Sequence, residues 1–234
     1  ALLLMRKQQN QEKLRPVLLV LPASLLGNWK TEIEKFAPSL KCVFVHPSQT
    51  APDQLKVAGE NPSAFIATGD IVLTTYSMLA RQPWLSAIEW GLVVLDEAQA
   101  IKNSGAKQTR LVKQLKTQNR IALTGTPVEN RLSDLWSLFD FVNPGLLGSA
   151  NAFREFVKRL EQRPTDQYAP LRKLAGPYIL RRLKTDKSVI ADLPDKIELQ
   201  AFCNLTKAQA VLYEQSVREL AQILKDKRGI ERRG

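Results

Sequence analysis

Two adjacent carboxylates follow a short hydrophobic segment in the middle of the chain. Residues 92–95 are Leu-Val-Val-Leu, and Asp96-Glu97-Ala98-Gln99 come directly after them. A buried strand ending here would place both carboxylates at the carboxyl edge of a parallel sheet, where α/β folds bind ligands. Asp96 could then hold Mg²⁺, and Glu97 could orient and deprotonate a water that attacks a phosphoryl group. The alternative is that the two charges only stabilise a helix N-terminus, where negative charge contributes roughly 0.3–1 kcal/mol.

A second polar turn follows another short hydrophobic segment, residues 120–123. Thr124, Gly125 and Thr126 stand there, and Pro127 shapes the turn. Its hydroxyls could sense the γ-phosphate beside the carboxylates and pass the state of that site on. As an isolated turn the segment would be unremarkable, and only its pairing with the acidic residues makes it specific.

Short hydrophobic segments with helical segments between them must position these turns. Each is four or five residues long and several are rich in β-branched residues, as buried parallel strands are when helices cover both faces of a sheet. They are residues 17–21, 42–45, 71–75, 92–95 and 120–123. Helices are predicted over residues 24–36, 105–116 and 132–141, with Ser24 and Ser133 as N-caps. The pattern predicts an α/β fold with a doubly wound parallel sheet.

The pattern changes after residue 145. Residues 153–160 and 171–174 look helical between several prolines, which predicts an appended helical element and a linker. Residues 197–202 alternate like a strand, and an amphipathic helix is predicted over residues 206–226. We therefore expect one domain followed by part of another.

The 234-residue chain is strongly basic, with 34 Lys and Arg against 23 Asp and Glu and a net charge of +11. This charge favours an anionic partner, most often nucleic acid, although a merely soluble basic surface explains it as well. His46 is the only histidine, which excludes histidine-based catalytic triads and His-rich metal sites. Cys42 and Cys203 have no metal-type spacing. No apolar stretch suits a membrane span, so we expect no membrane partner and a cytoplasmic location, nucleoid-associated in a bacterium or nuclear in a eukaryote.

Five segments together resemble the Swi/Snf family of helicase superfamily two, and the resemblance covers nearly the whole chain. They correspond to the family's motifs Ia, Ib, II and III and to its inter-lobe linker, and they are residues 16–29, 70–76, 96–103, 124–138 and 178–196. The linker and the stretch from Asn130 to Trp136 are the most discriminating of these features. The short segments that connect these motifs favour a bacterial or archaeal member of the family.

Members of this family are double-stranded-DNA translocases that remodel chromatin or other protein–DNA complexes. The resemblance therefore implies a RecA-like sheet of the P-loop NTPase class, with ATP and Mg²⁺ as cofactors and double-stranded DNA as partner. A protein partner on the DNA is expected as well. The implied catalytic residues are Glu97, Asp96 (which also holds Mg²⁺) and Gln99, and the implied coupling residues are Thr124, Gly125 and Thr126.

The same resemblance implies contacts with the DNA backbone, for which hydroxyls, amides and helix N-termini are suitable donors. The residues placed there are Ser24, Asn28, Thr74, Thr75, Tyr76, Lys102, Asn103, Arg181 and Arg182. Several have plainer alternatives. Ser24 could be only a helix cap, Lys102 could stabilise its own loop, and Arg181 could brace two lobes or lie on a solvated face. Trp29 is predicted to be a core residue rather than a base-stacking one.

The phosphate-binding pattern Gly-x-x-x-x-Gly-Lys-Ser/Thr does not occur in the sequence. We therefore expect residues 1–145 to be a first lobe truncated just beyond that loop, residues 146–195 a helical insertion and linker, and residues 196–234 the beginning of a second lobe. On this division the chain alone should hydrolyse ATP negligibly and would need the rest of the second lobe in cis. The competing hypotheses are a noncatalytic DNA- or protein-binding scaffold and an RNA helicase lobe.

Overall fold

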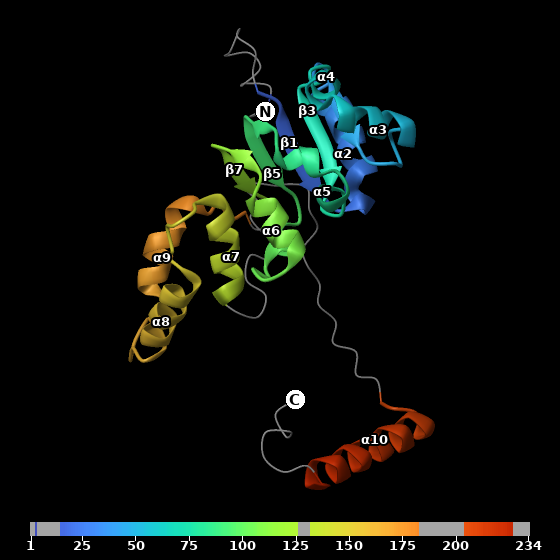
Figure 1. Ribbon diagram of the computed structural model, residues 1–234. Coiled ribbons are helices and arrows are strands. Elements are labelled where there is room, and N and C mark those ends of the chain that lie inside the picture. The colour runs from blue at the N-terminus through green and yellow to red at the C-terminus, as the bar shows by residue number, and fades with distance from the viewer. Residues whose placement is uncertain (1–2, 4–14, 126–131, 183–203, 227–234) are drawn as a thin grey trace. The chain divides into compact units, whose positions relative to one another are not determined.

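The computed structural model describes residue 3 and residues 15–125, 132–182 and 204–226 (Figure 1). The chain divides into two compact units, residues 1–172 and 173–234. Helix α10 (Lys207–Asp226) of the second unit confirms the helix predicted over residues 206–226. The strand predicted over residues 197–202 lies outside the described residues. Within the described ranges, no helix is both long and apolar enough to cross a membrane.

Five parallel strands form the main sheet of the first unit. They are β1 (Val17–Leu21), β2 (Cys42–Val45), β3 (Ile71–Thr75), β5 (Leu92–Leu95) and β7 (Arg120–Ala122). Their order is β2-β3-β1-β5-β7, and Val17 pairs with Ile71 on one side and with Leu92 on the other. Every residue of β1 and β3 is buried, which is why β1 is apolar throughout and β3 is apolar and β-branched. The predicted α/β fold with a parallel sheet is confirmed.

Helices cover both faces of this sheet, and alternate residues of β1 face opposite layers. Leu19 and Leu21 pack on the face covered by α2 (Leu26–Phe36). Leu18 and Val20 pack on the opposite face in a larger hydrophobic cluster. The helices that contribute to that cluster are α3 (Pro52–Glu60), α4 (Pro62–Ile66), α5 (Met78–Arg81), α6 (Lys107–Lys113) and α7 (Leu132–Val142). The sheet is therefore a rigid platform whose carboxyl edge carries the turns of interest.

Two predicted helix caps are wrong. Ser24 lies in a 3₁₀ turn, η1 (Ala23–Leu25), and α2 begins only at Leu26 without a side-chain cap. The backbone has already turned helical before α2, so a Ser24 side-chain cap has no free N–H to satisfy there. Ser133 lies inside the first turn of α7 rather than before it.

The helix predicted over residues 105–116 is shorter than expected, because the chain leaves α6 to form a second, two-stranded sheet. This sheet pairs β4 (Glu89–Trp90) with β6 (Lys116–Thr117) in parallel. A strand of two residues gives no alternation that a sequence pattern could detect. Trp90 is fully buried, and its indole donates to the Leu85 carbonyl at 2.9 Å, so this small sheet closes one side of the core.

Two further helices follow residue 145, as predicted. α8 (Ala150–Glu161) is capped by Ser149, whose Oγ accepts a hydrogen bond from the Ala152 N–H at 3.2 Å. α9 (Ala169–Ala175) follows it. Because α8 packs against α7, the first compact unit extends beyond residue 145 to residue 172.

Candidate functional site

The two turns singled out in the sequence meet at the carboxyl edge of the sheet. The Asp96 N–H donates to the Val20 carbonyl at the end of β1 at 2.8 Å. On the other side, the Ala98 N–H donates to the carbonyl of Leu123, which continues β7, at 2.9 Å. β2 and β3 lie on one side of β1, and β5 and β7 lie on the other, so the winding reverses between β1 and β5. Doubly wound sheets bind their ligands at such a switch point.

The Asp96 carboxylate is held by two donors, one on each oxygen. The indole Nε1–H of Trp29 donates to Oδ2 at 2.7 Å, and the Glu97 backbone N–H donates to Oδ1 at 3.0 Å. A carboxylate has about four lone-pair sites, so about two remain for other ligands. Asp96 is half-buried, and each of its oxygens accepts a hydrogen bond. Among the described residues, Asp96 forms no salt bridge. It is therefore fixed in place but still able to accept.

Tyr76 forms a hydrogen bond with the backbone of Asp96. Its hydroxyl donates to the Asp96 backbone carbonyl at 2.8 Å, and its ring is buried. Burial raises the pKa of Tyr76 far above its ordinary value, and the charges of Asp96 and Glu97 raise it further. The phenol therefore remains protonated and remains a donor throughout the physiological range of pH.

Gln99 joins the acidic pair to the threonine turn. Its amide nitrogen donates to Glu97 Oε2 at 2.5 Å, and its amide oxygen accepts from Thr124 Oγ1 at 2.7 Å. The Glu97 backbone is left-handed, with φ 48° and ψ 51°, which turns the chain sharply after Asp96. The predicted proximity of the two turns is thus confirmed, and one side chain connects them. Gly125 follows as an exposed residue.

Thr126 and Pro127 lie outside the described residues, so nothing tests their predicted part in coupling. Among the described residues no cluster of three or more His, Cys, Asp or Glu could hold a metal ion by itself. A metal at this edge would therefore depend on Asp96, with water or substrate oxygens completing its coordination, and hard oxygen donors of this kind suit Mg²⁺.

A family model described as the SNF2-related domain matches residues 1–233. The chain belongs to this family. It is 40% identical over 230 residues to YwqA of Bacillus subtilis, which is named as an ATP-dependent helicase/translocase. It is 34% identical over 221 residues to the chromatin-remodeling ATPase INO80 of Schizosaccharomyces pombe. These alignments cover 97% and 88% of this chain.

The fold match agrees with the sequence match. The SWI2/SNF2 ATPase core of Sulfolobus solfataricus, solved in complex with double-stranded DNA, is 41% identical with a TM-score of 0.68 over 98% of this chain. The RecA-like class predicted for the sheet is confirmed by this likeness. The chain spans 24% of YwqA, 14% of INO80 and 46% of the Sulfolobus core.

Ser24 and Asn28, two of the residues predicted to contact the DNA backbone, are exposed near the start of α2. Both lie close in sequence to Trp29, whose side chain reaches the acidic pair from the same first turn of the helix. Their positions suit phosphate contacts, which remain a prediction.

The candidates at the end of β3 have a different environment. The Thr74 hydroxyl is fully buried and donates to the Val45 carbonyl at 3.0 Å. Thr75 is 2% exposed and shares a hydrogen bond of 3.1 Å with Ser77. Together with Tyr76, these side chains are buried and their hydroxyls have partners within the protein, as buried polar groups require. A phosphate contact by these residues would need exposed hydroxyls and remains a prediction.

Lys102 and Asn103 lie beyond the acidic pair on an exposed loop. They line a hollow of about 720 Å³ with the first turns of α7 and with Arg154 and Phe153 of α8. Neither Asp96 nor Glu97 lines this hollow, so Lys102 and Asn103 lie apart from the acidic pair. Arg181 and Arg182 belong to the second unit, where both are exposed.

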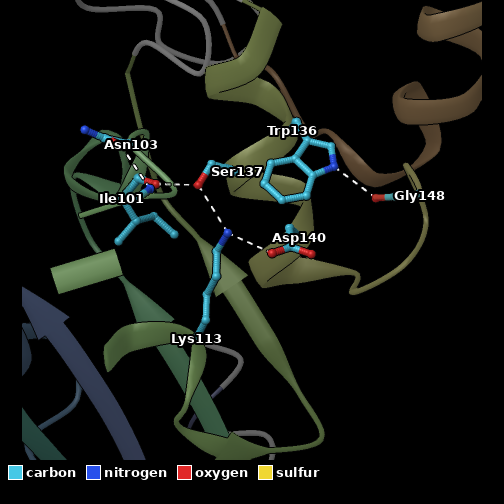
Figure 2. A network of polar contacts seen from close by, with 8 residues as sticks. Ile101, Asn103, Lys113, Trp136, Ser137, Asp140 and Gly148 are labelled. Carbon is cyan, nitrogen blue, oxygen red and sulfur yellow. Dashed lines mark hydrogen bonds and ion pairs between the residues drawn. The ribbon is translucent and has the colours of Figure 1, made fainter. Parts of the chain in front are cut away.

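A polar network fastens the loop of the acidic pair to α7 (Figure 2). The buried Ser137 hydroxyl donates to the Ile101 carbonyl at 2.6 Å. Lys113 Nζ lies 3.3 Å from Ser137 Oγ and 2.8 Å from Asp140 Oδ2, and it stands over the Trp136 ring at 4.9 Å. The loop after β5 is therefore held at both ends, by Tyr76 at one end and by Ser137 at the other.

Sequence reasoning missed the bond that Trp29 makes in the site. Trp29 packs against the core as predicted, but it is only half-buried, and its indole also donates to Asp96 across 67 positions of the chain. No spacing rule connects residues so far apart. The only available signal was that an indole N–H in a part-buried position needs an acceptor.

Proposed function

We propose that this chain supplies the hydrolytic first lobe of a DNA-dependent ATPase that moves along duplex DNA. The observation that carries the proposal is the continuous hydrogen-bonded path from Glu97 through Gln99 to Thr124 at the sheet edge. The relatives named as an ATP-dependent translocase and as a remodeling ATPase support it, as does the Sulfolobus core solved with double-stranded DNA. The second lobe would act in cis and close over the nucleotide.

Each residue of the path has a distinct role in this proposal. Asp96 would hold Mg²⁺ through its remaining lone pairs, and the metal would neutralise charge that develops on the transferring phosphoryl group. Glu97 would orient the attacking water and accept its proton. Gln99 fixes the Glu97 carboxylate and connects it to Thr124, so a change at the γ-phosphate would reach the threonine turn as a change in hydrogen bonding.

The DNA would lie across the carboxyl edge near the start of α2. Exposed hydroxyl and amide groups at Ser24 and Asn28 are suitable phosphate donors. The net charge of +11 favours a polyanion and predicts that binding weakens steeply with salt. Phosphate contacts position a duplex without reading its sequence, which suits a protein that translocates.

Glu97→Gln tests the proposal in the full-length two-lobe protein that contains this chain, because ATP binding also needs a phosphate-binding loop that these residues lack. We expect phosphate release stimulated by duplex DNA to fall at least about 100-fold, since a positioned general base contributes at least that much. Binding of a fluorescent ATP analogue should persist. Glu32→Gln, on the exposed surface of α2, is the matched control and should keep full activity.

Three results would contradict the proposal. Unchanged hydrolysis in Glu97→Gln would show that Glu97 is not the general base. Equal stimulation by duplex RNA and duplex DNA would favour an RNA helicase, because recognition of the 2′-hydroxyl separates the two polymers. If neither polymer stimulates hydrolysis, the hypothesis of a noncatalytic scaffold would be favoured.

A further inference from the structure

We infer that Trp29 is a positioning residue that couples helix α2 to the Asp96 carboxylate. The inference rests on the proposed function, since it concerns how the DNA-facing helix influences the hydrolytic edge. Its basis is the 2.7 Å hydrogen bond from the Trp29 indole to Asp96 Oδ2. This bond is charge-assisted, and bonds of that kind are roughly twice as strong as neutral ones.

The bond joins two segments that no strand pairing joins. α2 packs on the sheet through Leu26 and Ile33, and Asp96 follows β5. Trp29 lies in the first turn of α2, directly after the exposed Asn28. A helix displaced or rotated at this turn must move the indole as well. The geometry of the bond to Asp96 therefore reports the position of the exposed turn.

Trp29 also decides which way the carboxylate faces. It occupies one lone pair on Oδ2, and the Glu97 N–H occupies one on Oδ1. With a donor on each oxygen, the plane of the Asp96 carboxylate is fixed, and the remaining lone pairs point in set directions. Removing the indole donor frees the side chain to rotate. Partners that orient a metal-binding group in this way affect metal affinity or activity by about 10–100-fold.

A phosphate bound at the start of α2 would therefore act on the carboxylate through one rigid ring. Hydrogen bonds weaken steeply with misalignment, so a small rotation of α2 is enough to strengthen or loosen the bond. The Tyr76 hydroxyl holds the Asp96 backbone carbonyl, so the backbone of the turn stays in place while the carboxylate responds. Trp29 thus links polymer binding to the metal site without touching either polymer or nucleotide.

Trp29→Phe, in the protein that carries this chain with its second lobe, tests the inference. Phenylalanine keeps an aromatic ring but cannot donate. We expect the Mg²⁺ concentration for half-maximal binding of a fluorescent ATP analogue to rise about 10-fold or more. Duplex DNA should lower this concentration in the parent protein and have no such effect in the variant, while DNA affinity itself stays within about threefold.

Trp84→Phe is the matched control. Trp84 is also half-buried, and its indole also donates to a side-chain oxygen, Gln82 Oε1, at 2.8 Å. Loss of that bond should leave the Mg²⁺ dependence unchanged. If Trp29→Phe and Trp84→Phe give the same Mg²⁺ titration, the inference is overturned.

A measurement on the unaltered protein covers the case in which Trp29→Phe does not fold. This chain contributes 4 tryptophans, and therefore 4 indole N–H resonances, to the spectrum of the ¹⁵N-labelled protein. The Trp29 resonance should shift on addition of Mg²⁺ with ADP and again on addition of duplex DNA. A resonance that shifts with neither ligand overturns the inference.

Asp96→Asn separates this inference from the proposed function. If that variant loses Mg²⁺-dependent hydrolysis while Trp29→Phe behaves like the control, the hydrolytic site stands and only the role of Trp29 fails. If Asp96→Asn retains full hydrolysis, the proposed function itself fails.

Discussion

The ends of β3 and β5 lie at the same edge of one parallel sheet, yet their polar residues have different environments. At the end of β3, Thr74 and Thr75 are buried and bonded within the protein. After β5, Asp96 and Glu97 are half-buried, and each carboxylate keeps lone pairs that no described partner fills. The comparison teaches that position at the edge is not sufficient for a functional role. Residual hydrogen-bonding capacity distinguishes the turn after β5, for which we propose a reactive role, from the buried end of β3.

The largest effect is expected from Gln99→Glu, which would break the path beyond β5. The new carboxylate would face the Glu97 carboxylate where an amide now donates at 2.5 Å. Like charges at this separation repel strongly, so DNA-stimulated hydrolysis should fall about 100-fold, as when a general base is misplaced. Phosphate release by the two-lobe protein measures this.

Gln108→Glu is the control for that change. The Gln108 amide donates to the Ala100 carbonyl at 3.0 Å and does not reach the acidic pair. Its replacement should cost stability without a comparable loss of hydrolysis. Equal losses in both variants would show that the loop tolerates no added charge, and the path through Gln99 would have no special role.

A smaller effect, on stability rather than turnover, is expected from Thr74→Val at the end of β3. Valine has nearly the same shape but leaves the buried Val45 carbonyl without its side-chain donor. The free energy of unfolding should drop by about 1–2 kcal/mol. Urea denaturation measures it, and Thr31→Val on the exposed face of α2 should change it by less than about 0.5 kcal/mol. Weakened DNA binding without lost stability would place Thr74 in the DNA interface after all.

The smallest effect is expected from Lys102→Gln, outside both strand ends. Loss of one phosphate contact should reduce the slope of log affinity against log salt by about 1 and weaken binding uniformly across DNA sequences. Salt titrations of duplex binding measure the slope. Lys56→Gln on exposed α3 should leave it unchanged. An unchanged slope for Lys102→Gln would restrict this residue to stabilising its loop.

The sequence predicted the parts of the fold that depend on continuous burial. Segments 17–21 and 71–75 form strands with the predicted bounds, because strands covered on both faces are rich in apolar and β-branched residues. The prediction from the sequence was wrong at the start of α2, where the 3₁₀ turn η1 is found in place of a Ser24 cap. It also missed the sheet of β4 and β6, since two residues carry no period.

The site was predictable in its chemistry but not in its connections. Adjacent carboxylates after a hydrophobic strand identify Asp96 and Glu97 from the sequence alone. Which side chains reach them depends on the packing of α2 and on the register of β1 with β5, and both are long-range properties. Trp29 and Tyr76 therefore appear in the site only once the fold is known.

The left-handed backbone of Glu97 has a consequence for how this position can change over generations. A residue with a Cβ pays on the order of 1 kcal/mol to adopt such a conformation, and branched side chains suit it worst. Glycine and asparagine suit it best, but neither carries a carboxylate. Under the proposed function, stability of the fold and hydrolysis therefore place opposite demands on position 97, and glycine there would relieve the backbone at the cost of the proposed base.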